Sequence, residues 1–302
     1  MELAADFSFQ PLPAVANAVQ APFPEVASPL GPLAGLAGTW SGRGFNMIWR
    51  PNHASGQDHF LELNVTSEQL EFSPISGSIP NRGLLQPDIN MFGLTYLQQI
   101  SDANVKAGLH IEPGLWLAIP QTSNPSEAPT VARLASIPHG TAIVAQGTAS
   151  TSAGAPVIPN TSIRPFTIGQ PSALIEFAEE TLTTASSFRT AGAGLTGVTQ
   201  AMVSNPNSVL QAAIAGQHIQ EATKLHVSTT DLPVQGGGTA NTAFLKGAAQ
   251  GPNAVSVSVN ATFWLETIEG SPAIQQLQYA QTVLLNFNGL SWPHITVATL
   301  RQ

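Results

Sequence analysis

The residue pair best placed for chemistry is His110 and Glu112, in the segment LHIEPGLW. Residues two apart on a strand share a face, so an imidazole would stand beside a carboxylate, and such a pair can shuttle protons. The same pair could instead line a polar seam or satisfy a buried hydrogen bond. His110 and Glu112 are therefore candidate catalytic residues, with a purely structural role as the alternative.

The other histidines offer weaker sites. The chain has seven histidines and no cysteine, so any metal must be held by His, Asp, Glu or a prosthetic group. In the loop RPNHASGQDHF the spacing of His53, Asp58 and His59 could seat a divalent ion, although loop histidines are usually solvated. His294 begins the last apolar segment, where its ring could face either the interior or solvent.

The composition limits the partners and the location of the protein. Of 302 residues, 43% are hydrophobic and only 9% are charged, well below the roughly 25% of an average globular chain, which argues against a disordered or coiled-coil protein. The net charge of −8 argues against nucleic acid as a partner. No apolar run is long enough for a membrane-spanning helix, and the first residues lack the charged start of a secretory signal. We therefore expect a cytoplasmic protein, and the sequence leaves its oligomeric state open.

Most of the chain has the alternation of β-strands. Phe60–Thr66 places Leu61, Leu63 and Val65 on one face, and Val255–Leu265 predicts that Val257, Val259 and Phe263 face the interior. The other expected strands are Gly38–Trp49, Phe92–Ile100, Gly108–Ile119, Val131–Ser136, Thr141–Ser150, Ile219–Thr230, Leu277–Phe287 and His294–Leu300. The pair Asn288-Gly289 predicts a tight turn between the last two strands.

The middle of the chain differs from the rest. Helical periodicity indicates helices at Ala173–Phe188 and Pro206–Ala215, the second capped by Asn205. We therefore expect an extended arm at 1–30 and one β-barrel domain at 31–302, with a partly helical insertion at about 151–218. The insertion should pack outside the barrel or over one of its mouths.

Three motifs together resemble the nitrobindin family of heme-binding barrels. The segment LAGLAGTWSGRG, with Gly38-Thr39-Trp40, is similar to the opening strand of that family, and LHIEPGLW is similar to its H-x-E-x-G strand. His294 stands on the last strand, where the family carries its heme ligand. The similarity covers roughly residues 36–150 and 255–302; Pro113 and Leu115 depart from the family pattern.

This resemblance implies a mainly β, up-and-down antiparallel barrel of about ten strands, of the calycin type, holding one heme b near its mouth. His294 would be the iron ligand, and His110 would stand on the other face of the heme. Thr39 and Trp40 belong to the matched heme-binding motif. The family binds nitric oxide at ferric heme and is credited with isomerising peroxynitrite to nitrate.

Two further functions stay open, so the sequence does not decide whether the protein is an enzyme. The barrel could carry an apolar small molecule, such as a fatty acid or terpenoid, without heme. Alternatively, the cavity could support cofactor-free acid–base chemistry through His110 and Glu112.

Overall fold

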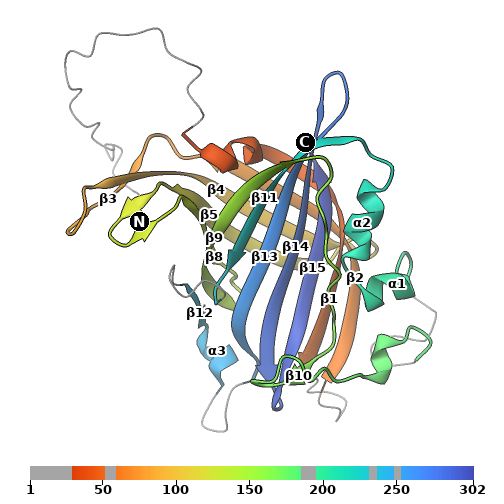
Figure 1. Cartoon of the computed structure of the whole chain (residues 1–302). Helices are drawn as coiled ribbons and strands as arrows, with labels where there is room; N and C mark the ends of the chain where they lie inside the picture. Colours follow the sequence, from red (N-terminus) through yellow and green to blue (C-terminus); the bar gives the residue numbers. More distant parts are fainter. Residues whose placement is uncertain (1–28, 52–58, 185–194, 231–236, 248–252) are drawn as a thin grey trace, which may run out of the picture.

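Ten strands close into an antiparallel barrel in the computed structural model, which describes residues 29–51, 59–184, 195–230, 237–247 and 253–302 (Figure 1). The barrel strands are β1 (Gly38–Pro51), β2 (His59–Pro74), β4 (Ile89–Asp102), β5 (Gly108–Ile119), β8 (Thr130–Ser136), β9 (Thr141–Ala153), β11 (Ile219–Ser228), β13 (Val255–Ile268), β14 (Ile274–Phe287) and β15 (Leu290–Arg301). The first and last strands pair from Ser41↔Arg301 to Ile48↔His294, which closes the ring. The expected mainly β fold is confirmed.

The remaining strands and helices do not belong to this ring of ten strands. Short strands are β3 (Ile79–Asn81), β6 (Thr122–Ser123), β7 (Ser126–Glu127), β10 (Phe166–Thr167) and β12 (Gly238–Asn241). The helices are η1 (Gly31–Leu36), η2 (Ala178–Glu180), α1 (Gln200–Ser204), α2 (Ser208–Ile214) and α3 (Ala243–Lys246). Within the described residues, no helix is long and apolar enough to cross a membrane.

The turn between β14 and β15 forms as the sequence predicts. Asn288 and Gly289 both have positive φ, 50° and 79°, the backbone that an Asn-Gly hairpin turn requires. This turn fixes the register of β15, and hence the strand face on which His294 lies, because a two-residue hairpin sets which residues pair.

One end of the barrel is solid. The helix η1 covers this end with Leu33 and Leu36, and the indole Nε1 of Trp40 donates to the Leu36 carbonyl at 2.7 Å. The core beneath contains Phe72, Trp116 and the interior residues of the remaining strands. Packing this end leaves only the opposite half of the barrel for a cavity.

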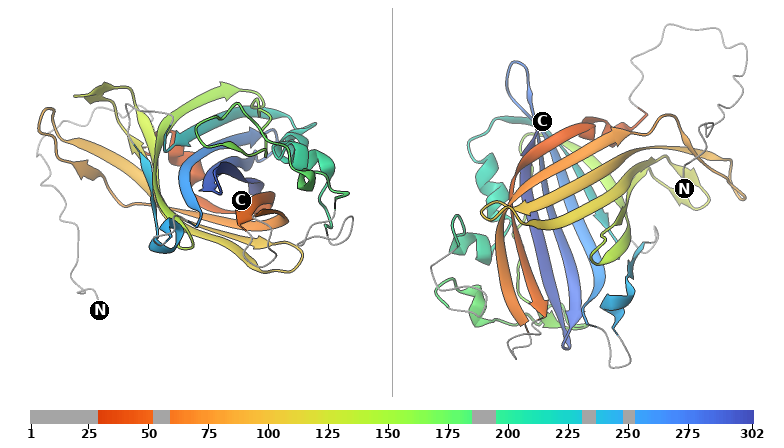
Figure 2. Two further views of the ribbon diagram at one scale, coloured as in Figure 1. Left: turned by 90° about the horizontal axis from the view of Figure 1, so that it is seen from below. Right: turned by 180° about the vertical axis from the view of Figure 1, so that it is seen from behind.

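The insertion covers the outside of the barrel. The described residues between β9 and β11 lie beside β15, β1 and β2, and the view along the barrel axis shows them on one side (Figures 1 and 2). Val203 of α1 and Leu210 of α2 pack with Phe45 and Met47 of β1, and Trp49 Nε1 donates to the Ile163 carbonyl at 2.9 Å. These strands are therefore apolar on their outer face.

The packing of the insertion against the barrel explains why the apolar residues of β2 change from one face of the strand to the other. Leu61 and Leu63 pack in the outer cluster, whereas Leu70 and Phe72 pack in the inner core. The two pairs lie on opposite faces of one strand whose pairing with β1 has no bulge. The apolar face of β2 thus changes from outside to inside where the insertion ends and the solid core begins.

The helix predictions need correction. Within the expected helix at 173–188, the described residues form only the short turn Ala178–Glu180. The second helix begins at Ser208, after Asn207, and Asn205 instead donates to and accepts from residues of the neighbouring loop. The second predicted helix is thus confirmed in part, as Ser208–Ile214, whereas Phe177 and Leu182 of the first pack in the outer cluster without forming a longer helix. The expected arm at 1–30 lies almost entirely outside the described residues.

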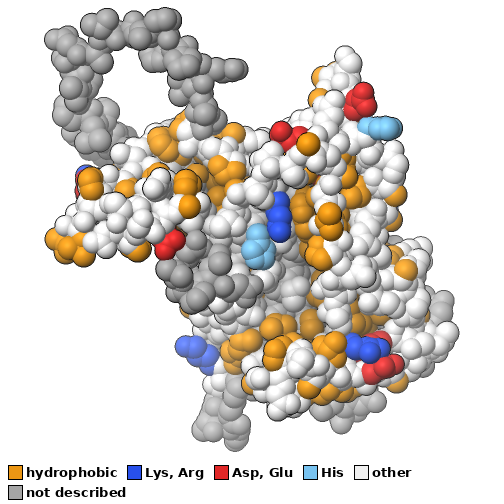
Figure 3. All heavy atoms as spheres, in the orientation of Figure 1, with side chains coloured by type: hydrophobic (Ala, Val, Ile, Leu, Met, Phe, Trp, Pro, Cys, Tyr) orange, Lys and Arg blue, Asp and Glu red, His pale blue; other side chains and the backbone are white. Residues whose placement is uncertain are grey.

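The projecting hairpin of β3 and β4 carries apolar side chains away from the barrel. Figure 3 shows hydrophobic side chains on this projection, on a face that carries few charged groups (Figure 3). Its loop includes Leu84 and Leu85, which are 95% and 74% exposed. No described residue covers these two side chains.

Candidate ligand-binding cavity

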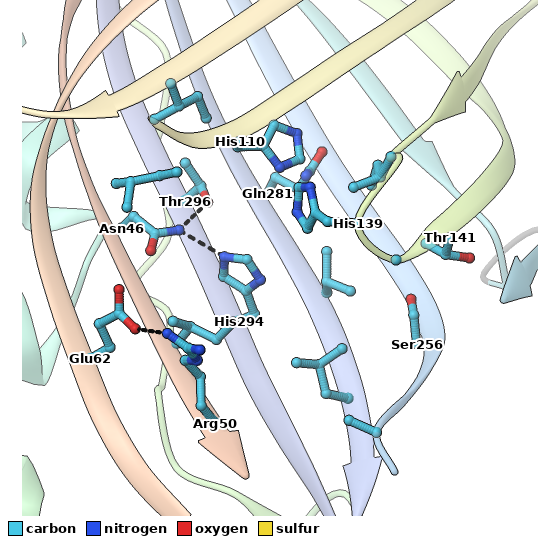
Figure 4. Close-up of a pocket in the computed structure, with 18 of the residues that line it drawn as sticks. Asn46, Arg50, Glu62, His110, His139, Thr141, Ser256, Gln281, His294 and Thr296 are labelled. Atoms are coloured by element: carbon cyan, nitrogen blue, oxygen red, sulfur yellow. Dashed lines mark hydrogen bonds and ion pairs between the residues drawn. The ribbon is translucent and has the colours of Figure 1, made fainter. Parts of the chain in front are cut away.

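The half of the barrel opposite η1 encloses a cavity of about 530 Å³, within the usual range for small-molecule sites (Figure 4). Its apolar lining residues are Ile48, Ile100, Leu109, Ile137, Leu245, Ala254, Val283 and Leu285. Its polar lining residues are Asn46, Arg50, Glu62, Gln98, His110, His139, Thr141, Asn253, Ser256, Tyr279, Gln281, His294 and Thr296.

His294 lies in the wall of this cavity, on the inner face of β15. Asn46 on β1 is paired with Thr296, so its amide reaches both Thr296 Oγ1, at 2.9 Å, and His294 Nε2, at 2.7 Å. Burial lowers the pKa of His294 to about 3, helped by the positive charges of His110, His139 and Arg50. The ring is therefore a neutral imidazole at physiological pH, oriented by one amide.

His110 lies on another part of the same wall, as Figure 4 shows. Its Nε2 is 3.1 Å from Oε2 of Glu112, and its ring meets that of His139 edge-on with centroids 5.0 Å apart. Burial lowers the pKa of His139, and the charge of His110 adds to the effect. Glu112 itself is fully buried and does not line the cavity, so it can act on a ligand only through His110.

A buried ion pair holds Glu112 in place. Arg133 on β8 donates to Glu112 Oε1, to Tyr96 Oη at 2.9 Å and to Gln281 Oε1 at 2.6 Å. Burial alone would raise the pKa of Glu112, but the Arg133 charge and hydrogen bonds from His110 and Tyr96 outweigh it and lower the pKa to about 2. Glu112 is thus firmly ionised, and it orients His110 instead of accepting a proton near neutral pH.

A second buried carboxyl lies beneath the cavity. Glu68 accepts hydrogen bonds from Thr66 at 2.7 Å and from Tyr279 at 2.5 Å, and Gln98 donates to the Tyr279 oxygen at 2.8 Å. Burial raises the pKa of Glu68 to about 7, against the lowering effect of these hydrogen bonds. Tyr279 and Gln98 line the cavity. When Glu68 is ionised, the Tyr279 hydroxyl must donate to the Glu68 carboxylate. When Glu68 is protonated, the Tyr279 hydroxyl is free to donate to a ligand.

Glu68 makes the stability of the fold depend on pH. Its folded pKa lies above its ordinary value of 4.5, so the folded protein keeps a proton that the unfolded chain releases between about pH 4.5 and 7. Stability from this group is complete below that window and is lost as the pH rises through it. In the wild type, Glu68 should lower the free energy of unfolding by up to about 3 kcal/mol between pH 5 and pH 8. We expect Glu68→Gln to remove this decline, as measured by urea unfolding at the two pH values.

The exposed Glu71, on the same strand, provides the control. Glu71→Gln should leave the decline unchanged. If Glu68→Gln declines as steeply as the wild type, Glu68 does not hold this proton.

The structure places the remaining predicted site residues away from the cavity. Trp40 is buried in the core at the solid end and Thr39 is exposed on the outer face, so neither lines the cavity. His59 lies in the outer aromatic cluster with Trp49, where its ring centroid is 5.6 Å from that of the indole. His53 and Asp58 lie outside the described residues.

No cluster of three or more His, Asp or Glu side chains that could hold a metal ion occurs in the described ranges. A prosthetic group that supplies its own metal needs only one protein ligand, and His294 could serve as that ligand.

The sequence reasoning missed Asn46, Arg133 and Ser256. Asn46 and Arg133 are polar residues on the inward face of otherwise apolar strands, in GFNMIW and VARLAS, and that contrast was the available signal. Ser256 gave no signal, because its orientation depends on a local irregularity of β13.

Comparisons with known proteins add little. No protein-family model matches the chain, and no curated protein matches it. Among solved structures, the chain is similar to Rv2717c from M. tuberculosis, with 15% identity, a TM-score of 0.41 and coverage of 91% of this chain and 98% of that chain. A likeness of this degree carries no argument about function.

Proposed function

We propose that the cavity binds heme b, with His294 as the ligand of the iron, and that small ligands such as nitric oxide bind on the heme face towards His110. The observation that carries this proposal is a neutral imidazole in the wall of a largely apolar cavity. A neutral imidazole nitrogen is a good iron ligand, and one such ligand suffices to hold heme.

The surroundings of His294 fit this role. Its hydrogen bond with Asn46 gives the imidazole the polar partner that a metal-binding histidine needs on its other nitrogen. With the Asn46 amide reversed, its oxygen would accept from Nε2–H of His294 and from the Thr296 hydroxyl. The Nδ1 lone pair would then be free to bind iron. The two amide orientations have nearly the same shape, and we expect the reversed one in the heme-bound protein.

The other residues of the cavity would shape the ligand-binding side. Bound heme iron would supply a Lewis-acidic coordination position. His110, held by Glu112, offers a hydrogen-bonding group from another part of the wall, and His139 packs against it. Arg50 lines the cavity with its side chain half exposed and could pair with a carboxylate of the heme, although it already pairs with Glu62 at 2.5 Å.

Hemin titration followed by absorption spectroscopy tests the proposal. The wild type should take up hemin and give a Soret band, and His294→Ala should lose hemin or shift the band. His110→Ala should keep hemin and alter only the binding of nitric oxide. His218, which is exposed at the start of β11, gives the matched control: His218→Ala should behave as the wild type.

The proposal fails if the wild type takes up no hemin, or if His294→Ala binds it with an unchanged spectrum. The apolar-carrier function then becomes the better candidate. It is favoured by the apolar side chains that line the cavity, among them Ile100, Val283 and Leu285. Mass spectrometry of molecules extracted from the purified protein would identify such a cargo.

A further inference from the structure

The start of β13 is held in an unusual way. β11 ends at Ser228, opposite Asn260, so Val255–Ser258 at the start of β13 pair with no described strand backbone on that side. Side chains of β12 replace it: Ser256 N donates to Asn241 Oδ1 at 2.9 Å, and the Ser256 carbonyl accepts from Asn241 Nδ2 at 2.8 Å and from Thr239 Oγ1 at 3.0 Å. The backbone of Ser256 is thus fully hydrogen-bonded.

A bulge then turns the Ser256 side chain inwards. The pairing with β14 shifts between Ser256 and Ser258, and Val257 is the extra residue. Ser256 therefore lines the cavity, while Val257 is only half-buried and is absent from the inner core, which corrects the expected interior position of Val257.

The Ser256 hydroxyl lacks a partner among the residues that the structure describes. The residue is 3% exposed, and its Oγ has no hydrogen bond to any described group. A buried hydroxyl without a partner costs free energy, and nearly all buried polar groups are hydrogen-bonded. Because this oxygen lies at the cavity surface, a bound molecule can provide the missing partner.

The charged residues that line the cavity limit the chemistry of that bound molecule. Among the described lining residues, Arg50 and Glu62 are the only ones from the Lys, Arg, Asp and Glu types, and they pair with each other. Ala254 and Leu285 add apolar surface to the same cavity. Since Arg50 pairs with Glu62, a buried carboxylate would find no uncommitted Lys or Arg in the described lining as a counter-charge.

We propose that Ser256 Oγ is a ligand-binding group that hydrogen-bonds an uncharged oxygen, such as that of a ketone, on an otherwise apolar molecule. This ligand class goes beyond heme and would occupy the heme-free cavity, so hemin should compete with it. The bulge and the two β12 side chains hold the hydroxyl in position before the ligand arrives.

Isothermal titration calorimetry of the heme-free protein with 2-octanone, and with 1-octene as its apolar counterpart, tests this role. Ser256→Ala should weaken 2-octanone binding roughly tenfold, which corresponds to about 1.4 kcal/mol, and leave 1-octene binding unchanged. Ser258→Ala, two residues along the same strand and on the outer face, should leave both affinities unchanged.

Three results would overturn the proposal. They are no binding of 2-octanone by the wild type, equal binding by Ser256→Ala, or an equal loss for both probes in Ser256→Ala. Hemin uptake, measured separately, decides the heme proposal alone: a wild type that binds 2-octanone but takes up no hemin retains the Ser256 role and loses the heme function.

Discussion

Replacement of Arg133 by methionine is expected to lower the free energy of unfolding by about 3–5 kcal/mol, because it leaves the buried Glu112 carboxylate without its counter-charge. Arg133 is 1% exposed and donates to Glu112, Tyr96 and Gln281, so the change breaks three buried hydrogen bonds at once. Urea unfolding at pH 7 measures the loss.

A second substitution separates charge from packing. Glu112→Gln combined with Arg133→Met removes both charges, and it should recover part of the stability lost in Arg133→Met alone. Arg43, exposed on β1, is the control, and Arg43→Met should change stability little. A double variant no more stable than Arg133→Met would show that the unpaired charge is not the cause.

Replacement of Val259 by aspartate should cost about 4 kcal/mol of stability, the scale of an unpaired charge placed in an apolar core. Val259 is 1% exposed and packs with Phe263 and Tyr279 inside the barrel. Its neighbour Ser258 lies on the outer face, where an aspartate can reach water, so Ser258→Asp should have a much smaller effect. Equal melting temperatures for the two variants would show that the register of β13 is wrong.

The strands were predictable because each one follows a local rule. Alternation within β13 and the Asn-Gly pair before β15 depend only on nearby residues. The Asn-Gly turn is confirmed, and the interior positions of Val259 and Phe263 are confirmed, whereas that of Val257 is wrong because of the bulge. Closure through β1 and β15 was also predictable, since strand-like segments at the two ends of the described barrel need partners.

The face of each strand that meets the interior was less predictable. Alternation shows that Leu61 and Leu63 share a face, but not that this face points outwards under α1 and α2. That outcome depends on where the insertion packs, which is a tertiary contact. Of the helix predicted at 173–188, the described residues up to 184 form only Ala178–Glu180 for the same reason: Phe177 and Leu182 pack in the outer cluster.

The residues of the candidate site also differ in how far the sequence could predict them. His110 and His294 could be selected by residue type and motif, and the structure places both on the wall of one cavity. Asn46 could not be linked to His294, because the two are 248 residues apart and meet only through the register of β1 with β15. Ser256 depends on a bulge, which no composition rule reveals.

The insertion also limits how far this protein can be simplified by engineering. Its two ends are adjacent, since Gly154 N donates to the Gln220 carbonyl at 2.9 Å, so deleting it and joining β9 to β11 is topologically easy. The deletion would nevertheless uncover Phe45 and Met47 on β1 and Val297 on the neighbouring strand β15. A contiguous apolar strip of this kind promotes self-association. A shortened barrel would therefore need polar replacements on that face before it could serve as a soluble scaffold.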